Sequence, residues 1–521
     1  MSRRVVEVAP EVARVAPRRS VAQTLLLGAE PVVLVALLAL AVVARRPHYL
    51  LSHSFWLDEG WVVDSVRAPI GQLRMLTSST PIGWTLLLRA VPPLGGPERY
   101  RLLPLAFAVA TLPLAWMLAR GLGRRGTVRA AVAAATAALV PASLARHDLK
   151  QYSAEGFVAV GVVLLVAWVE EGWSRRRLAL LALLGAVSIL IANIAPLVVL
   201  GGLLALVLAE AARREWRHAA EACVAGVAVG SLHLLVYLTV AGAGDNPAMR
   251  RWWLPDYIHL DNGLGPAARF VGDRVVAMLT TVGLGPWWLV LALVAVGVWS
   301  LARAGRPAAA LLLPLLAVEL VVAAAAQRYP FLEARTSLFV AVMAAVYAAL
   351  GLGALIAELL ARAWTVPLAI GVAVGAAVLL IPAAADAARH PMPSANVREQ
   401  IAVVRAHWRS GDAIVVNSAG TFPFAYYWPD QPTFVHTNQS TAVDFMVTYP
   451  DHPELVMVNG SNFGGVAPAM AKAHAAAGRI WVIFAHGAPS TVRRWSAEAA
   501  RYGHIDHPGP KALPLLVQSA R

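Results

Sequence analysis

The stretch LLLGAEPVVLVALLALAVVA, residues 25–44, decides the class of fold, because it is long and apolar enough to cross a membrane. About 20 apolar residues in a helix span the roughly 30 Å of hydrocarbon in a bilayer. Similar runs recur along most of the 521 residues, of which 58% are hydrophobic and 14% charged. A soluble protein cannot bury so much apolar surface, so we expect a polytopic α-helical membrane protein.

This first run also indicates how the chain begins. No small-residue cleavage pattern follows it, so we interpret it as a retained helix and not as a signal peptide. The net charge of +14 does not indicate nucleic-acid binding, because the arginines lie in short clusters between apolar runs. Only three of the 44 basic residues are lysines, a skew that suggests a GC-rich bacterial genome. The single cysteine, Cys223, excludes a disulfide within the chain.

The arginine clusters predict the topology. The tail before the first run carries five arginines, and the positive-inside rule places it in the cytoplasm. If the clusters at 120–129, 175–177, 213–217 and 303–306 are also cytoplasmic, the spans between them come in pairs. This gives about eleven spans, near residues 25–44, 100–121, 128–145, 153–170, 178–193, 195–212, 219–240, 276–302, 307–326, 336–359 and 364–386. An odd number of spans places the C-terminus on the side opposite the cytoplasmic N-terminus, outside the cell.

We therefore expect three parts: a cytoplasmic tail (1–22), a transmembrane module (23–390) whose first outer loop is 45–99, and an extracytoplasmic α/β domain (391–521). Within the loop, residues 80–95 are too short and proline-rich to span, so we expect a helix in the outer interface. In the last part, strands are predicted at 413–418, 433–437, 455–458 and 479–486, with helices at 396–409, 464–477 and 490–502. Without a dinucleotide or phosphate-loop motif, this domain is expected to support the site or bind an acceptor.

The polar stretches all fall on the predicted outer side. They are FWLDEGW (55–61), SSTPIGW (78–84), ARHDLKQYS (145–153), DNPAMRRWWLPDY (245–257) and QRYPFLEAR (327–335). The predicted cytoplasmic junctions, in contrast, are plain arginine clusters. Any chemistry is therefore expected on the outer face.

Two adjacent acids, Asp58 and Glu59, stand out in the first of these stretches. Taken alone, they are compatible with an ordinary helix start, because acids near a helix N-terminus favour the dipole. Their aromatic neighbours, Trp61 among them, place them at a membrane interface. Carboxylates there can act as a general base or hold a divalent cation such as Mg²⁺, Mn²⁺ or Ca²⁺.

Two cationic clusters suit an anion such as a phosphate. One is Arg146-His147-Asp148-Leu149-Lys150-Gln151-Tyr152, and the other contains Arg328, Tyr329 and Arg335. Interfacial anchoring of these cations is the alternative for both. Trp252 can stack on a sugar ring or anchor the membrane, and Thr80 opens the short interfacial helix. The histidines show no metal-ligand spacing.

Together these motifs resemble a known family. An outer loop with Asp-Glu is followed by a proline-led amphipathic helix. The stretches RLLPLAFAVATLPLAWMLAR (101–120), LKQYS (149–153) and YPF…R (329–335) come after that helix, in this order. This ordered set, over about residues 20–390, is similar to bacterial GT-C membrane glycosyltransferases, including protein O-mannosyltransferases and lipid A aminoarabinose transferases (glycosyltransferase family 39-like). The chain departs from the resemblance at SSTPIGW (78–84), where many relatives have His-Pro-Pro.

The resemblance implies transfer of a sugar from a polyprenyl phosphate to an acceptor hydroxyl, with inversion, on the outer face of a bacterial plasma membrane. The acceptor would be a cell-wall polysaccharide, a glycolipid or a protein. It implies that Asp58 is the base, with Glu59 orienting it or sharing a metal. The donor phosphate would be bound by Lys150, Arg335, Arg328, Tyr152 and Arg146. Further sugar or acceptor contacts are assigned to Trp61, Thr80, His147, Asp148, Trp252 and Tyr329.

Two other functions are compatible with the sequence. A transporter or flippase of lipid-linked saccharides would need charged or helix-breaking residues within its spans and inverted repeats. The spans here are nearly uncharged. A scaffold without catalytic activity, binding a cell-envelope partner through its α/β domain, would have no need for Asp58, Lys150 and Arg335.

Overall fold

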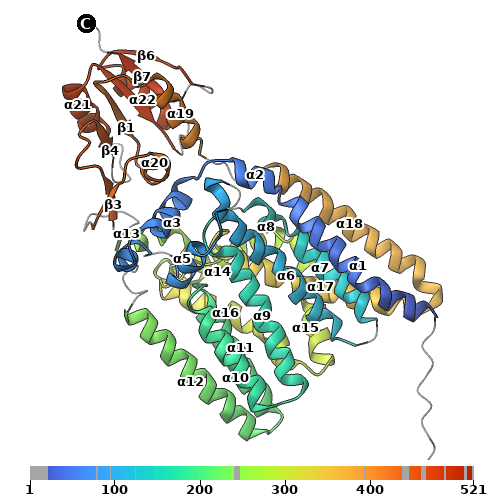
Figure 1. Ribbon diagram of the computed structural model, residues 1–521. Coiled ribbons are helices and arrows are strands. Elements are labelled where there is room, and N and C mark those ends of the chain that lie inside the picture. The colour runs from blue at the N-terminus through green and yellow to red at the C-terminus, as the bar shows by residue number, and fades with distance from the viewer. Residues whose placement is uncertain are drawn as a thin grey trace, which may run out of the picture.

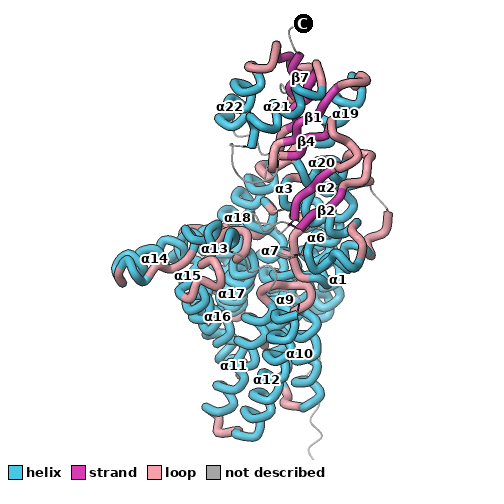
Figure 2. Tube along the Cα trace, turned by 90° about the vertical axis from the view of Figure 1, so that its left-hand side faces the viewer, coloured by secondary structure: helices cyan, strands magenta, loops and turns pink. Residues whose placement is uncertain are grey.

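The computed structural model of this protein describes residues 21–518, apart from residues 78–79, 94–95, 124, 147, 240–246, 392–394, 437–444, 459–464, 486–488 and 510–512. Its larger part is a bundle of helices, and a smaller α/β domain lies at one end of the bundle (Figures 1 and 2). The five arginines of the predicted cytoplasmic tail lie outside the described residues.

The bundle confirms the prediction of a multi-pass helical membrane protein. Nine helical stretches in the described part are long and apolar enough to cross a bilayer. The shorter helices α10 (Arg175–Ser188) and α15 (Trp287–Arg303) occupy two further predicted spans. The other spans contain α1 (Val21–Ala44), α6 (Leu102–Arg120), α7 (Gly126–Leu139) with α8 (Pro141–Ala145), α9 (Tyr152–Glu171), α11 (Ala195–Ala212), α12 (Trp216–Thr239), α16 (Pro307–Ala325), α17 (Leu338–Leu359) and α18 (Val366–Arg389).

One predicted span has the wrong boundary. The run at 276–302 is not continuous, because residues 276–280 end a separate helix, α14 (Leu264–Thr280), and α15 begins only at Trp287. Between the two helices Gly283 and Gly285 have φ values of 79° and 109°, which glycine adopts without strain. The sequence signal for this break is Gly-Leu-Gly-Pro at 283–286.

Helix α17 forms the core of the bundle, where it packs against α7, α9 and α15. Almost all its side chains are buried. Its closest approach is to α15: a Cβ on Gly351 would lie 2.1 Å from the carbonyl oxygen of Leu293, and a Cβ on Gly297 would lie 2.0 Å from that of Tyr347. Small residues allow helix backbones to approach in this way where lipid provides no hydrophobic drive for association.

The arginine clusters gather at the end of the bundle remote from the α/β domain. Arg213 lies 3.8 Å from Glu170, and Arg306 lies 3.5 Å from Glu171. Arg120 lies 3.0 Å from Glu30, near the start of α1. These ion pairs join helix ends that the positive-inside rule predicts on one side of the membrane. The predicted pairing of the spans is therefore consistent with the packing.

The opposite end of the bundle carries short helices between the spans and the α/β domain (Figure 1). They are α2 (Pro47–Ser52), α3 (Leu57–Arg67), α4 (Leu73–Leu76), α5 (Ile82–Arg89) and α13 (Pro247–Trp253). The predicted helix within residues 80–95 corresponds to α5. Figure 2 shows α14 projecting sideways from the bundle at this level.

The α/β domain contains a five-stranded sheet in the order β4-β1-β5-β7-β6. Strand β1 (Asp412–Val416) is parallel to β4 (Leu455–Met457) and β5 (Arg479–Ile483), whereas β7 (Leu515–Gln518) is antiparallel to β5 and β6 (His504–Asp506). A separate hairpin pairs β2 (Thr433–His436) with β3 (Phe445–Thr448). Strands β3, β6 and β7 were not predicted.

Both faces of the sheet are buried. Ile414 and Val416 point into one apolar cluster and Ala413 and Val415 into the other, as the alternation of a strand requires. Helices α19 (Val397–His407) and α20 (Thr421–Tyr427) contribute to the first cluster, and α21 (Val466–Ala476) and α22 (Pro489–Ala499) to the second. The first cluster also contains Trp56 and Trp61, so the domain shares its core with the segment that carries the two acids.

Candidate active site

Asp58 and Glu59 lie in the first turn of α3, where negative charge is favourable near the unpaired backbone N–H groups. Successive residues of a helix point about 100° apart. The two carboxylates therefore face different surroundings, and the structure gives them different partners.

Asp58 is the centre of a three-residue ion cluster. Its Oδ2 lies 3.2 Å from Nζ of Lys150 and 3.5 Å from Nη1 of Arg335. The three side chains come from α3, from the segment before α9 and from the segment before α17. Only 14% of the Asp58 side chain is exposed, so this acid is held by partners and is not a free surface charge.

Glu59 instead points into the protein. Nε of Arg101 donates to its Oε1 (2.8 Å) and Nη2 donates to its Oε2 (2.5 Å), a bidentate pair. Burial raises the pKa of Glu59, an effect that Arg101 partly offsets. Arg101 also donates to the carbonyl oxygens of Leu50 and His53, both at 2.6 Å. It thereby anchors the start of α3 to α6, a role that sequence reasoning missed although Arg101 begins a quoted motif.

This geometry bears on the predicted divalent cation. Both carboxylate oxygens of Glu59 are engaged by Arg101, so Glu59 does not converge on Asp58. Among the described residues, no group of three or more His, Cys, Asp or Glu side chains is arranged to hold a metal. The residues present therefore do not fit a cation shared by Asp58 and Glu59.

Aromatic rings border both cations of the cluster. Nζ of Lys150 lies 5.0 Å from the ring centre of Trp61, and the guanidinium carbon of Arg335 lies 5.6 Å from that of Trp253. Such cation–π contacts restrict where the charges can move. The indole of Trp61 in turn donates to the carbonyl oxygen of Leu76 (3.0 Å).

Other predicted residues surround this cluster. Arg146 lies 3.5 Å from Asp148, whose pKa is raised by burial against the opposing effect of Arg146. Arg146 is thus occupied by its neighbour. Tyr152 is buried in the first turn of α9. His147 lies outside the described residues.

A polar cavity of about 590 Å³ opens beside Lys150. Four of the predicted residues line it: Lys150, Tyr152, Arg328 and Tyr329. The hydroxyl of Tyr329 donates to the carbonyl oxygen of Thr336 (2.6 Å). The cavity is completed by Gln151, Glu155, Asn193, His233, Leu234, Tyr237, Met249, Arg250, Trp253, Tyr257, Gln327, Pro330 and Thr336.

The other described residues of the predicted site do not line this cavity: Asp58, Glu59, Trp61, Thr80, Arg146, Asp148, Trp252 and Arg335. Trp252 is 60% exposed, and its neighbour Trp253 lines the cavity instead. Thr80 is buried, and its backbone N–H donates to the carbonyl oxygen of Thr77 (3.1 Å).

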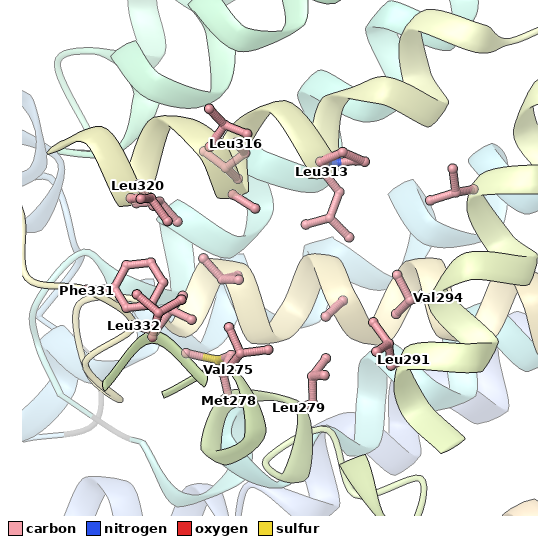
Figure 3. Close-up of a pocket in the computed structure, with 18 of the residues that line it drawn as sticks. Val275, Met278, Leu279, Leu291, Val294, Leu313, Leu316, Leu320, Phe331 and Leu332 are labelled. Atoms are coloured by element: carbon pink, nitrogen blue, oxygen red, sulfur yellow. The ribbon is translucent and has the colours of Figure 1, made fainter. Parts of the chain in front are cut away.

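An apolar cavity of about 510 Å³ lies on the other side of the segment 327–336. Figure 3 shows Val275, Met278, Leu291 and Leu313 pointing into it from α14, α15 and α16. Phe331 and Leu332 also line it, whereas Arg328, Tyr329 and Pro330 line the polar cavity. The short Arg-Tyr-Pro-Phe-Leu stretch therefore borders both spaces, which sequence reasoning did not foresee.

Helix α20 of the α/β domain docks directly on α3. A Cβ placed on Gly60, two residues after Asp58, would lie 2.4 Å from the backbone nitrogen of Pro423 and 2.8 Å from the carbonyl carbon of Phe422. Only glycine permits this approach. Neither α20 nor this contact was predicted from the sequence, although the Gly60 that enables it stands within FWLDEGW (55–61).

Hydrogen bonds reinforce this junction. The hydroxyl of Tyr427 donates to Glu98 (2.8 Å) and accepts from the backbone N–H of Phe55 (2.9 Å). Arg398 of α19 also pairs with Glu98 (2.6 Å). Burial raises the pKa of Tyr427 well above its usual value, and Glu98 adds to the effect. The domain thus holds the segment that precedes Asp58 from two of its helices.

No protein-family model matches the sequence, and no curated protein matches it significantly. The fold, however, resembles solved structures along nearly the whole chain. The oligosaccharyltransferase of Archaeoglobus fulgidus, solved with Zn and sulfate, aligns over 94% of this chain and 73% of its own, with a TM-score of 0.53 and 14% identity. ArnT from Cupriavidus metallidurans aligns over 93% of this chain and 97% of its own, with a TM-score of 0.51 and 15% identity.

This chain has the GT-C fold. The resemblance seen in the sequence is thereby confirmed for the fold, since both solved structures are GT-C glycosyltransferases. A second structure of the same ArnT contains undecaprenyl phosphate and aligns with a TM-score of 0.50 and 14% identity. At such identities the GT-C fold is shared, whereas the roles of the site residues depend on their own geometry.

Proposed function

We propose that this protein is an inverting glycosyltransferase that moves a sugar from a polyprenyl-phosphate donor to an acceptor hydroxyl on the outer face of a bacterial plasma membrane. The observation that carries the proposal is the cluster in which one oxygen of Asp58 meets both Lys150 and Arg335 beside the polar cavity. A general base and two phosphate-binding cations are the groups that this reaction needs.

Asp58 is proposed as the base. Its carboxylate would take the proton of the acceptor hydroxyl while that oxygen attacks the anomeric carbon, and the bond from that carbon to the phosphate oxygen breaks. One displacement of this kind inverts the configuration. Glu59, paired with Arg101, would position α3 without touching the reacting atoms.

Lys150 and Arg335 would bind the departing polyprenyl phosphate. A phosphate bound between them would replace Asp58 as the partner of both cations. The Asp58 carboxylate would then be free to act as a base. Donors aimed at a developing anion in a partly buried site contribute strongly to catalysis, about 3 kcal/mol for a single donor in a well-studied case. The rings of Trp61 and Trp253 support the two cations in this task.

The apolar cavity offers a place for the polyprenyl chain. Its lining residues are all apolar, and it adjoins the polar cavity across Arg328–Leu332. An apolar tail there and a phosphate at Lys150 would span the two spaces. The undecaprenyl phosphate in the ArnT structure, which has the same fold, supports a lipid-phosphate donor.

Binding of polyprenyl phosphate to the purified protein tests this function without knowledge of the sugar. We expect the lipid to raise the melting temperature of the wild type, and the rise to be lost in Lys150→Ala and Arg335→Ala. Arg362→Ala, at an exposed position, is the control that should retain it. A wild type that the lipid does not stabilise would contradict the proposal and favour the scaffold alternative.

A further inference from the structure

Three residues that line the polar cavity each have a buried polar atom without a hydrogen-bond partner among the described residues. The atoms are Oε2 of Glu155, Oε1 of Gln151 and Nδ1 of His233. Buried polar atoms in proteins are nearly always paired, so three residues with unpaired atoms around one cavity require an explanation. A bound ligand that supplies the missing partners is such an explanation.

The arrangement around Glu155 is held in place by its own bonds. Its other oxygen, Oε1, accepts from Nε2 of Gln151 (3.2 Å) and from the backbone N–H of Asn193 (3.2 Å). Two contacts fix the carboxyl group and leave Oε2 without a partner in the part of the chain that the structure describes. His233 comes from α12, whereas Glu155 and Gln151 come from the start of α9, so separate helices bring the three residues to one cavity.

We propose that Glu155, Gln151 and His233 bind the sugar ring of the donor through its hydroxyl groups, an inference that rests on the proposed function. A hydroxyl both donates and accepts, so it can satisfy each of the three atoms. Lys150, the proposed phosphate ligand, is next to Gln151 in the same wall, which places the phosphate end and the sugar end of one donor side by side.

The cavity also suits a sugar in size and surface. Its volume of about 590 Å³ lies within the usual range for small-ligand sites, about 300–1,000 Å³. Rings of Tyr237, Trp253 and Tyr257 line it beside the polar atoms, and aromatic faces pack well on the apolar faces of sugars. A sugar without the contacting hydroxyls would leave the three atoms unpaired, so these residues would select the donor.

A second buried carboxyl group serves as a control. Oε2 of Glu319 in α16 is likewise unpaired among the described residues, yet Glu319 lines neither the polar nor the apolar cavity. Loss of Glu319 should therefore change stability without changing the preference for a sugar-bearing lipid phosphate over the bare one.

The test compares two probes on each variant: bare polyprenyl phosphate, and the same lipid phosphate bearing glucose, mannose, galactose or arabinose. Native mass spectrometry of the detergent-solubilised full chain gives both dissociation constants. We expect the wild type to bind at least one sugar-bearing lipid more tightly than the bare phosphate. In Glu155→Ala this preference should fall by about tenfold or more while affinity for the bare phosphate is retained.

Two further variants complete the design. His233→Ala removes an unpaired atom from a different helix and should reduce the preference as well, which keeps the test valid if Glu155→Ala folds poorly. Glu319→Ala should keep the full preference. A preference unchanged in both Glu155→Ala and His233→Ala would overturn the inference and leave the proposed function intact. A wild type that binds neither lipid would contradict both.

Discussion

The carboxylate of Asp58 and the ammonium group of Lys150 are 3.2 Å apart, although they come from α3 and from the segment before α9. The contact joins the proposed base to the proposed phosphate site, so a change at either residue alters the electrostatics of the other. Only 14% of the Asp58 side chain is exposed, so Lys150 and Arg335 supply the partners that solvent would otherwise provide.

Asp58→Asn should abolish transfer. The amide keeps the shape of the side chain but cannot take a proton, and removal of a general base typically costs about 10²- to 10⁴-fold in rate. The melting temperature should fall less than in a variant of Glu59, because Arg335 keeps its second partner, Glu333 (3.4 Å), when Asp58 is neutralised. Initial rates with a polyprenyl-phosphate sugar check this, with exposed Asp261→Asn as the control. Normal turnover by Asp58→Asn would exclude Asp58 as the base.

Glu59→Gln should mainly lower stability, whereas Asp58→Asn mainly lowers the rate of transfer. Arg101 would be left as a buried cation without its counter-charge, and breaking a buried pair costs about 3–5 kcal/mol. We expect a clear drop in melting temperature, far beyond that of Asp58→Asn. The exposed pair of Glu358 and Arg362 provides the comparison, since Glu358→Gln should be nearly neutral. Equal melting temperatures for the two Glu→Gln variants would refute the structural role of Glu59.

Asp64 should make stability fall as pH rises. It is buried in α3, and burial raises its pKa well above the usual value although Arg67 opposes the shift. Between its unfolded pKa of about 4 and the raised folded pKa, the folded state keeps a proton that the unfolded state releases. Stability therefore decreases by up to about 1.4 kcal/mol per pH unit in that window. From pH 4 upward, the melting temperature should fall less steeply with pH for Asp64→Asn than for the wild type. Equal slopes for the two proteins would contradict the prediction.

Gly60→Ala should loosen the docking of the α/β domain on α3. The new methyl group would overlap the backbone of α20 at Phe422 and Pro423, so α20 must move away from α3. We expect slower transfer and a lower melting temperature. Gly71→Ala is the matched control, because a Cβ there meets nothing within 4 Å. Limited proteolysis of both variants measures the loosening directly, and equal protection of the domain would count against the docking.

Much of the candidate site was predictable because its residues stand out locally. Asp58, Lys150, Arg335 and Tyr329 are polar or charged residues in a chain of apolar runs, and the structure brings the first three together. Arg101, Glu155 and His233 were missed. Each lies within or at the edge of an apolar span, where one charged residue gives no sign of its partner.

The sequence by itself determined the membrane-spanning helices, the α/β domain and the side of the bundle that carries the acids. These follow from local properties: apolar runs of span length, the alternation of strands and the distribution of arginines. Only the tertiary structure decided that Glu59 turns to Arg101, that α20 rests on Gly60 and that residues 328–332 border two cavities. Such contacts join segments far apart in the chain, and they depend on how the helices pack rather than on any local pattern.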